Sequence, residues 1–307
     1  MTLGDPRGIG PEVVLSAARM LRAEQPAVEL ILLGATGDVE ALSEAFTAEG
    51  VGICDGTVSS AGRISLQAIQ RGVDLALSGE ASGLVTGPIH KPALQAAGAG
   101  SPGHTELLRE LTGAHRVGML MAAESTRLGP PLRILLATTH LALRDVPSAL
   151  TEDLLEDQIL LLRDSLRDLW GIPRPRIALC ALNPHASDGG LFGDEEARVM
   201  TPAVERLRDR GVEVTLPLSA DTVFLQAIEK SVDAVVVPYH DVGMAVFKTL
   251  AFGRGVNVTL GLPFIRTSPD HGTAFDLVGT GLADPTSTLE ALRLAARLAL
   301  HRKSSPL

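Results

Sequence analysis

The chain has 307 residues, which corresponds to about two domains at roughly 150 residues each. It carries 27 Lys and Arg against 36 Asp and Glu, so its formal net charge of −9 argues against nucleic-acid or anionic-membrane binding. Hydrophobic residues make up 45% and charged residues 21%, which excludes a disordered, collagen-like or coiled-coil chain. The two cysteines, Cys54 and Cys180, stand in no metal or redox spacing, and neither a signal peptide nor a membrane-spanning run is visible. We therefore expect a cytosolic protein.

Short apolar segments alternate with amphipathic segments along the chain. Helical spacing predicts a first helix over 11–21, a weak helix from about 90, and longer helices over 151–170, 194–210 and 287–301. Apolar runs predict strands at 28–33, 84–86, 117–122, 133–139, 177–182, 212–216, 233–237 and 256–260. This alternation predicts the α/β class with a largely parallel sheet, and the aromatic content of only 3% fits a core of Ala, Val, Leu and Ile.

Three of the predicted strands are followed by a histidine, namely His140, His185 and His240. Because ligands bind at the carboxyl ends of the strands in open α/β sheets, imidazoles from neighbouring strands would converge on one point. Three neutral imidazoles suit a divalent ion such as Zn²⁺, Co²⁺ or Mn²⁺, with an open position for a substrate oxygen. The alternative is that each histidine only forms a hydrogen bond to a nearby loop.

Basic and glycine-rich segments accompany these strand ends. Lys248 and Arg266 would hold an anionic substrate that carries phosphate or carboxylate, or they lie on a solvated surface. The segment GDPRGIGPE (4–12) precedes a helix, so its backbone amides would receive an anion. It lacks the third spaced glycine of a dinucleotide-binding loop and the Lys-Ser/Thr of a P-loop, so on its own it equally predicts a tight turn.

Eight motifs follow one another in a single order between Leu3 and Asp284: GDPRGIGPE (4–12), VTGPIHK (85–91), GHTE (103–106), TTH ending at His140, NPH ending at His185, SADT (219–222), PYHDVGMAVFK (238–248) and NVTLGLPFIRTSPDHGTA (257–274). Together they resemble the 4-hydroxythreonine-4-phosphate dehydrogenase family. The resemblance covers nearly the whole chain, and several of the matching strings are long.

The resemblance implies a fold similar to that of the isocitrate and isopropylmalate dehydrogenases, with two α/β/α domains and a cleft between them. We expect one domain at 1–112 plus 275–307 and a second at 113–274, which would carry most of the metal and substrate site. The implied activity is the NAD- or NADP-dependent oxidation of a phosphorylated hydroxy acid, with one divalent metal (Zn, Mg, Co or Mn). In the vitamin B6 pathway member, 4-phosphooxy-L-threonine is oxidised to a β-keto acid that loses CO₂ and gives 3-amino-2-oxopropyl phosphate.

The resemblance also implies roles for single residues in a homodimer whose site is shared across the interface. His140, His185 and His240 would be the metal ligands, with one of them supplied by the partner. Asp221 and Asp241 would be catalytic, either orienting the ligands or accepting a proton. The residues expected to contact the substrate are His104, Thr105, Lys248, Asn257 and Arg266.

This sequence departs from the family pattern at three places. Only Met1, Thr2 and Leu3 precede GDP, where the family usually has several more residues of a first strand, so either the start is shortened or the strand is stubby. Arg7 occupies a position where we expect a small residue, and it adds a charge beside the glycine-rich loop. The segment ASDGGLFGDEE (186–196) is similar to the family loop without being identical, which leaves substrate detail open.

Four alternative functions remain open at this point. The same chemistry would serve D-threonate or D-erythronate 4-phosphate in sugar-acid catabolism, or a cis-dihydrodiol that loses CO₂ as it becomes aromatic again. Retention of GHTE, Lys248 and Arg266 favours a phosphorylated anion. A three-His metallohydrolase is disfavoured because no His-x-His pair occurs, and a binding module would not need three metal ligands. NAD and NADP are not distinguished, because no dinucleotide fingerprint is visible.

Overall fold

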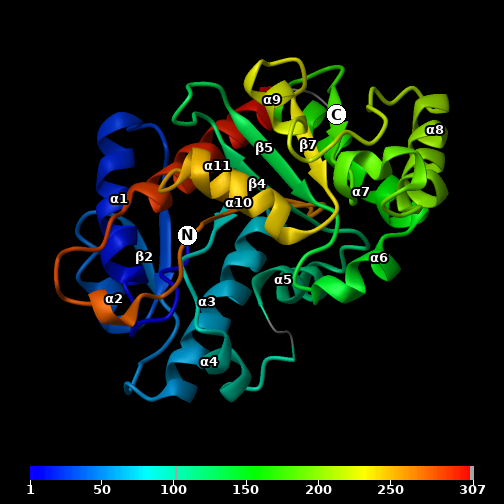
Figure 1. Cartoon of the computed structure of the whole chain (residues 1–307). Coiled ribbons are helices and arrows are strands. Elements are labelled where there is room, and N and C mark those ends of the chain that lie inside the picture. Colours follow the sequence, from blue (N-terminus) through cyan, green and yellow to red (C-terminus); the bar gives the residue numbers. More distant parts are fainter. Residues whose placement is uncertain (101–102, 305–307) are drawn as a thin grey trace. The chain divides into compact units, whose positions relative to one another are not determined.

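A computed structural model describes residues 1–100 and 103–304, and the chain divides into two compact units (Figure 1). Of the described residues, the first unit contains 1–100, 103–115 and 262–300, and the second contains 116–261 and 301–304. The predicted border at 275 is too late, because the segment 262–274 contributes a strand that pairs inside the first unit. No helix in the described ranges combines the length and the apolar character needed to cross a bilayer.

The first unit is built on parallel strand pairs. The strand β1 pairs with β2, and β3 pairs with β9, both in parallel. The elements are α1 (Gly10–Glu24), β1 (Ile31–Gly34), α2 (Thr36–Glu40), β2 (Thr47–Gly50), α3 (Val58–Leu77), β3 (Gly83–Val85), α4 (Lys91–Ala96), α5 (His104–Thr112), β9 (Ile265–Pro269), η4 (Phe275–Leu277) and α11 (Thr286–Ser304). The helix α3 and the strands β2 and β9 were not among the predicted elements.

The N-terminal residues form isolated bridges in place of a regular first strand. Thr2 makes parallel bridges to both Leu33 and Thr86, so it joins β1 to β3. The backbone N–H of Leu3 donates to the Leu33 carbonyl at 2.8 Å, and that of Thr2 donates to the Val85 carbonyl at 3.0 Å. These bonds fix the loop that follows, which carries the GDPRGIGPE motif.

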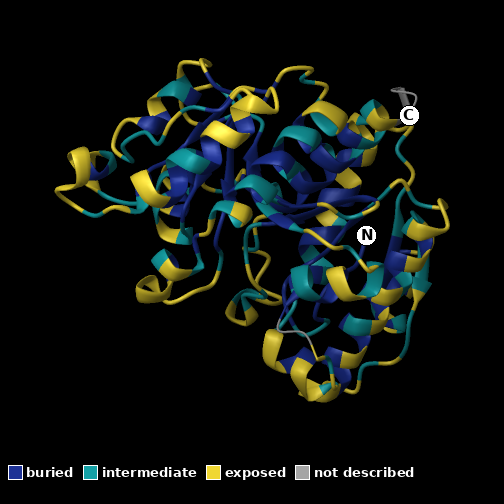
Figure 2. Cartoon of the chain, turned by 90° about the vertical axis from the view of Figure 1, so that its right-hand side faces the viewer, coloured by how far each residue is buried: buried dark blue, intermediate teal, exposed yellow. Residues whose placement is uncertain are grey.

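The long helix α3 covers this unit with one apolar face. Its buried residues recur every three or four positions, as an amphipathic helix requires, and Ile69 and Val73 pack with Leu84 of β3 and Leu108 of α5. The Thr57 side chain accepts a hydrogen bond from the Ser60 N–H and caps its start. Buried residues accordingly lie on the strands and on the inner faces of the helices (Figure 2).

The second unit holds a five-stranded array in the order β8-β4-β5-β7-β6. Its elements are β4 (Gly118–Ala123), β5 (Leu132–Leu136), η1 (Leu143–Asp145), α6 (Val146–Ala149), α7 (Glu152–Trp170), β6 (Ile177–Leu179), η2 (Pro184–Gly190), η3 (Glu196–Met200), α8 (Thr201–Asp209), α9 (Val223–Ile228), β7 (Ala234–Val237), α10 (His240–Ala251) and β8 (Val256–Leu260). The strand β4 runs antiparallel to both β5 and β8. Its direction against β5 follows from the short 124–131 connection, which has no room for a crossover helix.

Two predicted elements of this unit differ from the observed ones. The helix predicted over 194–210 begins as the π-helical turn η3 and continues as α8, and Pro202 lies where the two meet. Proline has no N–H and clashes with the carbonyl four residues earlier, which disturbs the regular α-helical pattern. The strand predicted over 212–216 is reduced to one isolated bridge, from Val214 to Ile177, and a second bridge joins Leu218 to Cys180 just beyond that range.

Helix α10 packs closely on β5 and β7. A Cβ atom at Gly243 would lie only 2.8 Å from the Val237 side chain and 3.1 Å from the Leu136 side chain. The absence of a side chain at Gly243 therefore lets the helix approach the sheet. Because α10 begins at His240, this contact holds that histidine at the carboxyl ends of the two strands.

Glycine also controls helix packing in the first unit, and this gives a stability test. A Cβ atom at Gly62 of α3 would overlap the carbonyl group of Ala93 in α4, whereas one at Gly37 of α2 would meet nothing within 4 Å. We expect Gly62→Ala to lower the free energy of unfolding by about 1–3 kcal/mol. Gly37→Ala, the matched control, should raise it by about 0.5–1 kcal/mol. Urea unfolding curves of both variants check this, and equal effects would contradict the close approach of α3 and α4.

Candidate functional site

The three candidate histidines follow three neighbouring parallel strands of the second unit. The strand β7 pairs in parallel with β5 on one side and with β6 on the other. His140 follows β5, His240 follows β7, and His185 follows β6. The three histidines thus follow strands that are neighbours in the sheet, as expected, and their use as metal ligands stays a prediction.

Two of these histidines lie close together. The ring centroids of His140 and His240 are 5.7 Å apart, with the ring planes tilted by 42°. Two imidazoles bound to one Zn²⁺ at metal–nitrogen distances of ~2.0–2.1 Å have centroids about 5–6 Å apart, so this pair fits a shared divalent ion. The Nδ1 atom of His240 lies 2.8 Å from the Asp241 carboxylate, so Nε2 is the ring nitrogen that this contact leaves for a ligand. Asp241 thus orients His240.

His185 is placed differently. It is exposed and lies in η2, where its backbone φ of 54° is in the left-handed region. Within residues 1–100 and 103–304, no three His, Cys, Asp or Glu side chains are grouped so that they could hold one metal ion. A single chain therefore brings together two of the three candidate ligands.

The remaining candidates of the second unit lie on separate elements. Asp221 is exposed in a turn that follows Leu218, and Leu218 bridges in parallel to Cys180 beyond β6. Lys248 lies two turns after His240 on α10, partly buried. Asn257 of β8 has a buried Oδ1 atom with no hydrogen-bond partner among the described residues. A buried carboxamide oxygen of this kind is suited to accept a hydrogen bond from a ligand.

The first unit contains a buried arginine at a candidate site position. Arg266 of β9 is almost fully buried, and its Nη2 atom donates a hydrogen bond of 2.6 Å to the hydroxyl of Thr86, which follows β3. Burial lowers the pKa of Arg266 to about 10, so the guanidinium remains charged at neutral pH. Because burying a charge is costly, a guanidinium in this position suits a site that receives an anion.

His104 and Lys91 belong to the same group of side chains. Burial lowers the pKa of His104 well below its ordinary value, and the positive charges of Arg266 and Lys91 lower it further. The Nε2 atom of His104 is buried and has no hydrogen-bond partner in the described part of the chain. His104 and Thr105 form the first turn of α5, whose N-cap Gly103 has no side chain to satisfy the free backbone N–H groups. Lys91 was not predicted as a site residue, although it ends the VTGPIHK motif.

The unexpected charge of Arg7 is neutralised inside the first unit. Arg7 forms two hydrogen bonds to the fully buried Asp5, of 3.1 Å from Nε and 2.8 Å from Nη2. This pairing raises the pKa of Arg7. The guanidinium carbon also lies 5.5 Å from the ring centroid of Phe275. Arg7 therefore joins the glycine-rich loop to the 270–284 segment.

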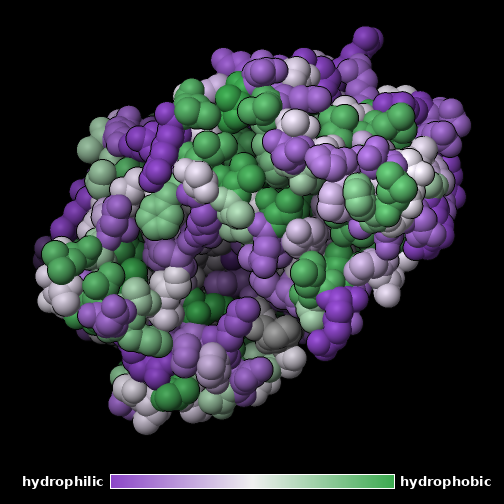
Figure 3. All heavy atoms as spheres, in the orientation of Figure 1, coloured by the Kyte–Doolittle hydropathy of each residue, from purple (hydrophilic) through white to green (hydrophobic). Residues whose placement is uncertain are grey.

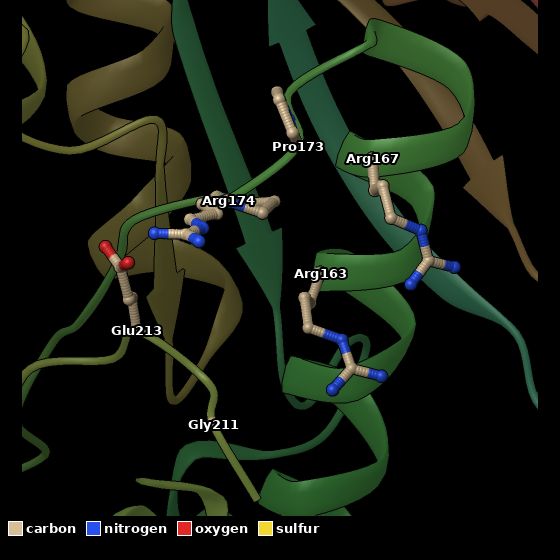
Figure 4. A pocket seen from close by; sticks show the side chains of 7 residues that line it. Arg163, Arg167, Pro173, Arg174, Gly211 and Glu213 are labelled. Carbon is tan, nitrogen blue, oxygen red and sulfur yellow. The ribbon is translucent and has the colours of Figure 1, made fainter.

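A surface pocket of the second unit, with a volume of about 380 Å³, contains none of the candidate residues (Figure 4). It is lined by Arg163, Arg167, Pro173, Arg174, Pro175, Gly211 and Glu213. Figure 4 shows that the guanidinium groups of Arg163 and Arg167 point away from Arg174. Arg163 pairs with Asp164 at 2.8 Å and Arg167 with Asp168 at 2.7 Å, so these cations do not converge on a ligand.

Known proteins resemble this chain over its full length. The 4-hydroxythreonine-4-phosphate dehydrogenase of Paracoccus denitrificans is 42% identical, and the match covers 98% of each chain. The crystal structure of the Klebsiella pneumoniae protein of the same name has a TM-score of 0.83 at 38% identity and covers 97% of this chain and 98% of that one. A terephthalate 1,2-cis-dihydrodiol dehydrogenase from Burkholderia xenovorans has a TM-score of 0.69 at 26% identity, with 96% of each chain covered.

More distant structures identify the fold. The isocitrate dehydrogenase of Methylococcus capsulatus has a TM-score of 0.54 at 15% identity and covers 99% of this chain and 86% of that one. The predicted relation to isocitrate dehydrogenase is therefore confirmed. The family model described as pyridoxal phosphate biosynthetic protein PdxA matches residues 15–295. The chain thus belongs to the PdxA family and is a dehydrogenase of that family.

Proposed function

We propose that this dehydrogenase oxidises 4-phosphooxy-L-threonine with NAD or NADP and releases CO₂, which gives 3-amino-2-oxopropyl phosphate for pyridoxal phosphate biosynthesis. The observation that carries the proposal is the buried cationic group around Arg266 and His104 in the first unit. A phosphate monoester matches a guanidinium, an ammonium and free N–H groups at a helix N-terminus. The full-length relatives named for this activity support the same substrate.

The phosphate would be held by His104, Thr105 and Arg266, with Lys91 as a fourth group. His104 is neutral at pH 7 because its pKa is lowered, so it donates one N–H without adding charge. Arg266 supplies the fixed charge, and its bond to Thr86 sets the direction of the guanidinium. Lys248 and Asn257 of the second unit would bind the carboxylate and amino end of the substrate. Holding the substrate at its polar groups orients the reacting carbon toward the nicotinamide, which accepts the hydride when the cofactor is bound.

His140, His185 and His240 would hold the divalent ion. When bound, this ion supplies positive charge that favours loss of the substrate hydroxyl proton and, after oxidation, loss of CO₂. Asp241 keeps the His240 ring in one orientation through Nδ1. Asp221 is our candidate for the proton acceptor, because its turn follows a segment that is parallel to β6 and ends at the edge of the histidines.

The third ligand points to a homodimer. One described chain groups only two of the three histidines, so a second copy would complete the site. Exposed apolar side chains flank the candidate ligands, with Leu141 and Leu143 after His140, and Phe192 after His185. Apolar side chains also interrupt the hydrophilic surface on the face drawn in Figure 3. Covering such side chains is a common reason for association.

The substrate is tested by turnover of the metal-loaded protein. NADH or NADPH formation and CO₂ release are followed with 4-phosphooxy-L-threonine, with D-threonate 4-phosphate, with D-erythronate 4-phosphate and with a cis-dihydrodiol, each with and without chelator. We expect chelator-sensitive turnover that is fastest with the first compound. Faster turnover of one of the sugar-acid phosphates would agree with the proposed phosphate site and contradict the role in pyridoxal phosphate biosynthesis. Faster turnover of the dihydrodiol would contradict both the phosphate site and that role.

Arg266 gives a test of the phosphate site. Hydrogen bonds to charged groups contribute about 1.5–3 kcal/mol, so Arg266→Ala should raise KM for the phosphorylated substrate by about 10–100-fold. Arg266→Lys keeps the charge and loses the planar fork, so its KM should lie between those of the parent chain and Arg266→Ala. Arg174→Ala, an exposed arginine of the pocket in Figure 4, is the control and should leave KM unchanged. An unchanged KM in Arg266→Ala would remove it from the site.

A shared site predicts complementation between inactive variants. His185→Ala and His240→Ala should each lose activity and bound metal when pure. If the two histidines of one site come from different protomers, subunit exchange between the variants restores about a quarter of the sites. Activity and metal content of the exchanged mixture are measured against each variant exchanged with itself. No recovery after confirmed exchange would place both histidines on the same protomer.

A further inference from the structure

The loop that carries His185 has an unusual backbone. Its φ angles are 54° at His185, 53° at Ala186, 69° at Ser187, 44° at Asp188 and 68° at Gly189. Residues with side chains disfavour this left-handed region, and here four of them adopt it in succession. Such a turn persists only when the surrounding structure holds it in place. The contacts that hold the turn therefore also determine the direction of the His185 side chain.

Glu196 makes these contacts. It is the first residue of η3 and is buried. Its Oε1 atom accepts hydrogen bonds from the backbone N–H groups of Leu182 at 2.8 Å and Asn183 at 2.7 Å. Its Oε2 atom accepts from the Asn183 amide at 2.9 Å and from the Ser187 hydroxyl. The carboxylate thus ties the chain on both sides of His185.

The charge of Glu196 suits this arrangement. Burial opposes ionisation of the carboxyl group, but the hydrogen bonds from Ser187 and Asn183 outweigh it and lower the pKa of Glu196. An ionised carboxylate only accepts hydrogen bonds, and the groups around Glu196 are all donors. A glutamine in its place would have nearly the same shape, but its NH₂ group would replace one of the two oxygens. That NH₂ group cannot accept the hydrogen bonds that the replaced oxygen accepts in Glu196.

We propose that Glu196 is a positioning residue for His185, because it clamps the left-handed turn and thereby fixes the imidazole as a metal ligand. The inference rests on the proposed function, in which His185 binds the divalent ion. His240 is oriented differently, since Asp241 contacts its ring directly. Glu196 acts on His185 through the backbone and does not touch the ion or the substrate.

The test measures Zn²⁺ affinity of the full chain by competition with a chromogenic chelator. Residues that orient metal ligands contribute about 10–100-fold to affinity, so Glu196→Gln should weaken Zn²⁺ binding by that factor. Glu195→Gln is the matched control, because it removes the same charge one residue away and its carboxamide oxygen can still accept the single bond of 2.7 Å that the Asn183 amide donates to Glu195. The control should bind Zn²⁺ within about threefold of the parent chain, well below the range for a residue that orients a ligand.

A double-mutant cycle separates positioning from a general structural role. If Glu196 acts through His185, then Glu196→Gln should cause no further loss of Zn²⁺ affinity once His185→Ala is present. Full additivity of the two losses would overturn the proposal. If His185→Ala alone leaves affinity unchanged, the metal assignment of the proposed function fails, and the inference fails with it. If His185→Ala weakens binding and Glu196→Gln does not, only the inference fails.

Ser187→Ala provides a second test that does not depend on the folding of Glu196→Gln. It removes one donor and leaves the two backbone bonds to Glu196 in place. We expect a smaller loss of Zn²⁺ affinity than in Glu196→Gln, with circular dichroism and thermal unfolding like those of the parent. Unchanged Zn²⁺ affinity in both Ser187→Ala and the refolded Glu196→Gln would overturn the proposal.

Discussion

The parallel pairing of β5, β7 and β6 is the constraint on which the placement of the candidate metal ligands depends. Parallel neighbours end at the same edge, so a side chain that follows each strand starts from the same side of the sheet. Gly243 adds the close approach of α10, whose first residue is His240. In this arrangement the His240 ring lies 5.7 Å from the His140 ring.

Two carboxylates orient candidate ligands in physically different ways. Asp241 is exposed and contacts the His240 ring itself, so its charge is partly screened by water. Glu196 is buried, and its hydrogen bonds go to the backbone and side chains around His185. A buried carboxylate with several donors is costly to disturb, because each unpaired donor would remain out of water. This cost explains why Glu196 can hold the left-handed turn that contains His185.

Strong local patterns made much of this fold predictable. Thr151 and Gly171 bound α7 as their capping chemistry predicts, and the apolar runs over 233–237 and 256–260 contain β7 and β8. The order of motifs identified the family and its fold, which the comparisons confirm. The strand β2 was missed because its sequence TAEG has no apolar alternation. The left-handed turn after Pro184 could not be predicted, because bonds to Glu196 across intervening residues stabilise it against local preference.

The division of candidate residues between the units bears on how the two binding functions can vary. His104, Thr105 and Arg266 belong to the first unit, whereas the three histidines belong to the second. The hydrogen bond from Arg266 to Thr86 joins two residues of the first unit, whereas the bonds from His240 to Asp241 and from Asn183 to Glu196 join residues of the second. The bond to Thr86 and the bonds to Asp241 and Glu196 therefore depend on different residues, so single substitutions can alter them separately. If the proposed roles hold, substitutions around Arg266 would change the preference for the anion without removing a candidate metal ligand, which is one physical route to different substrates on this fold.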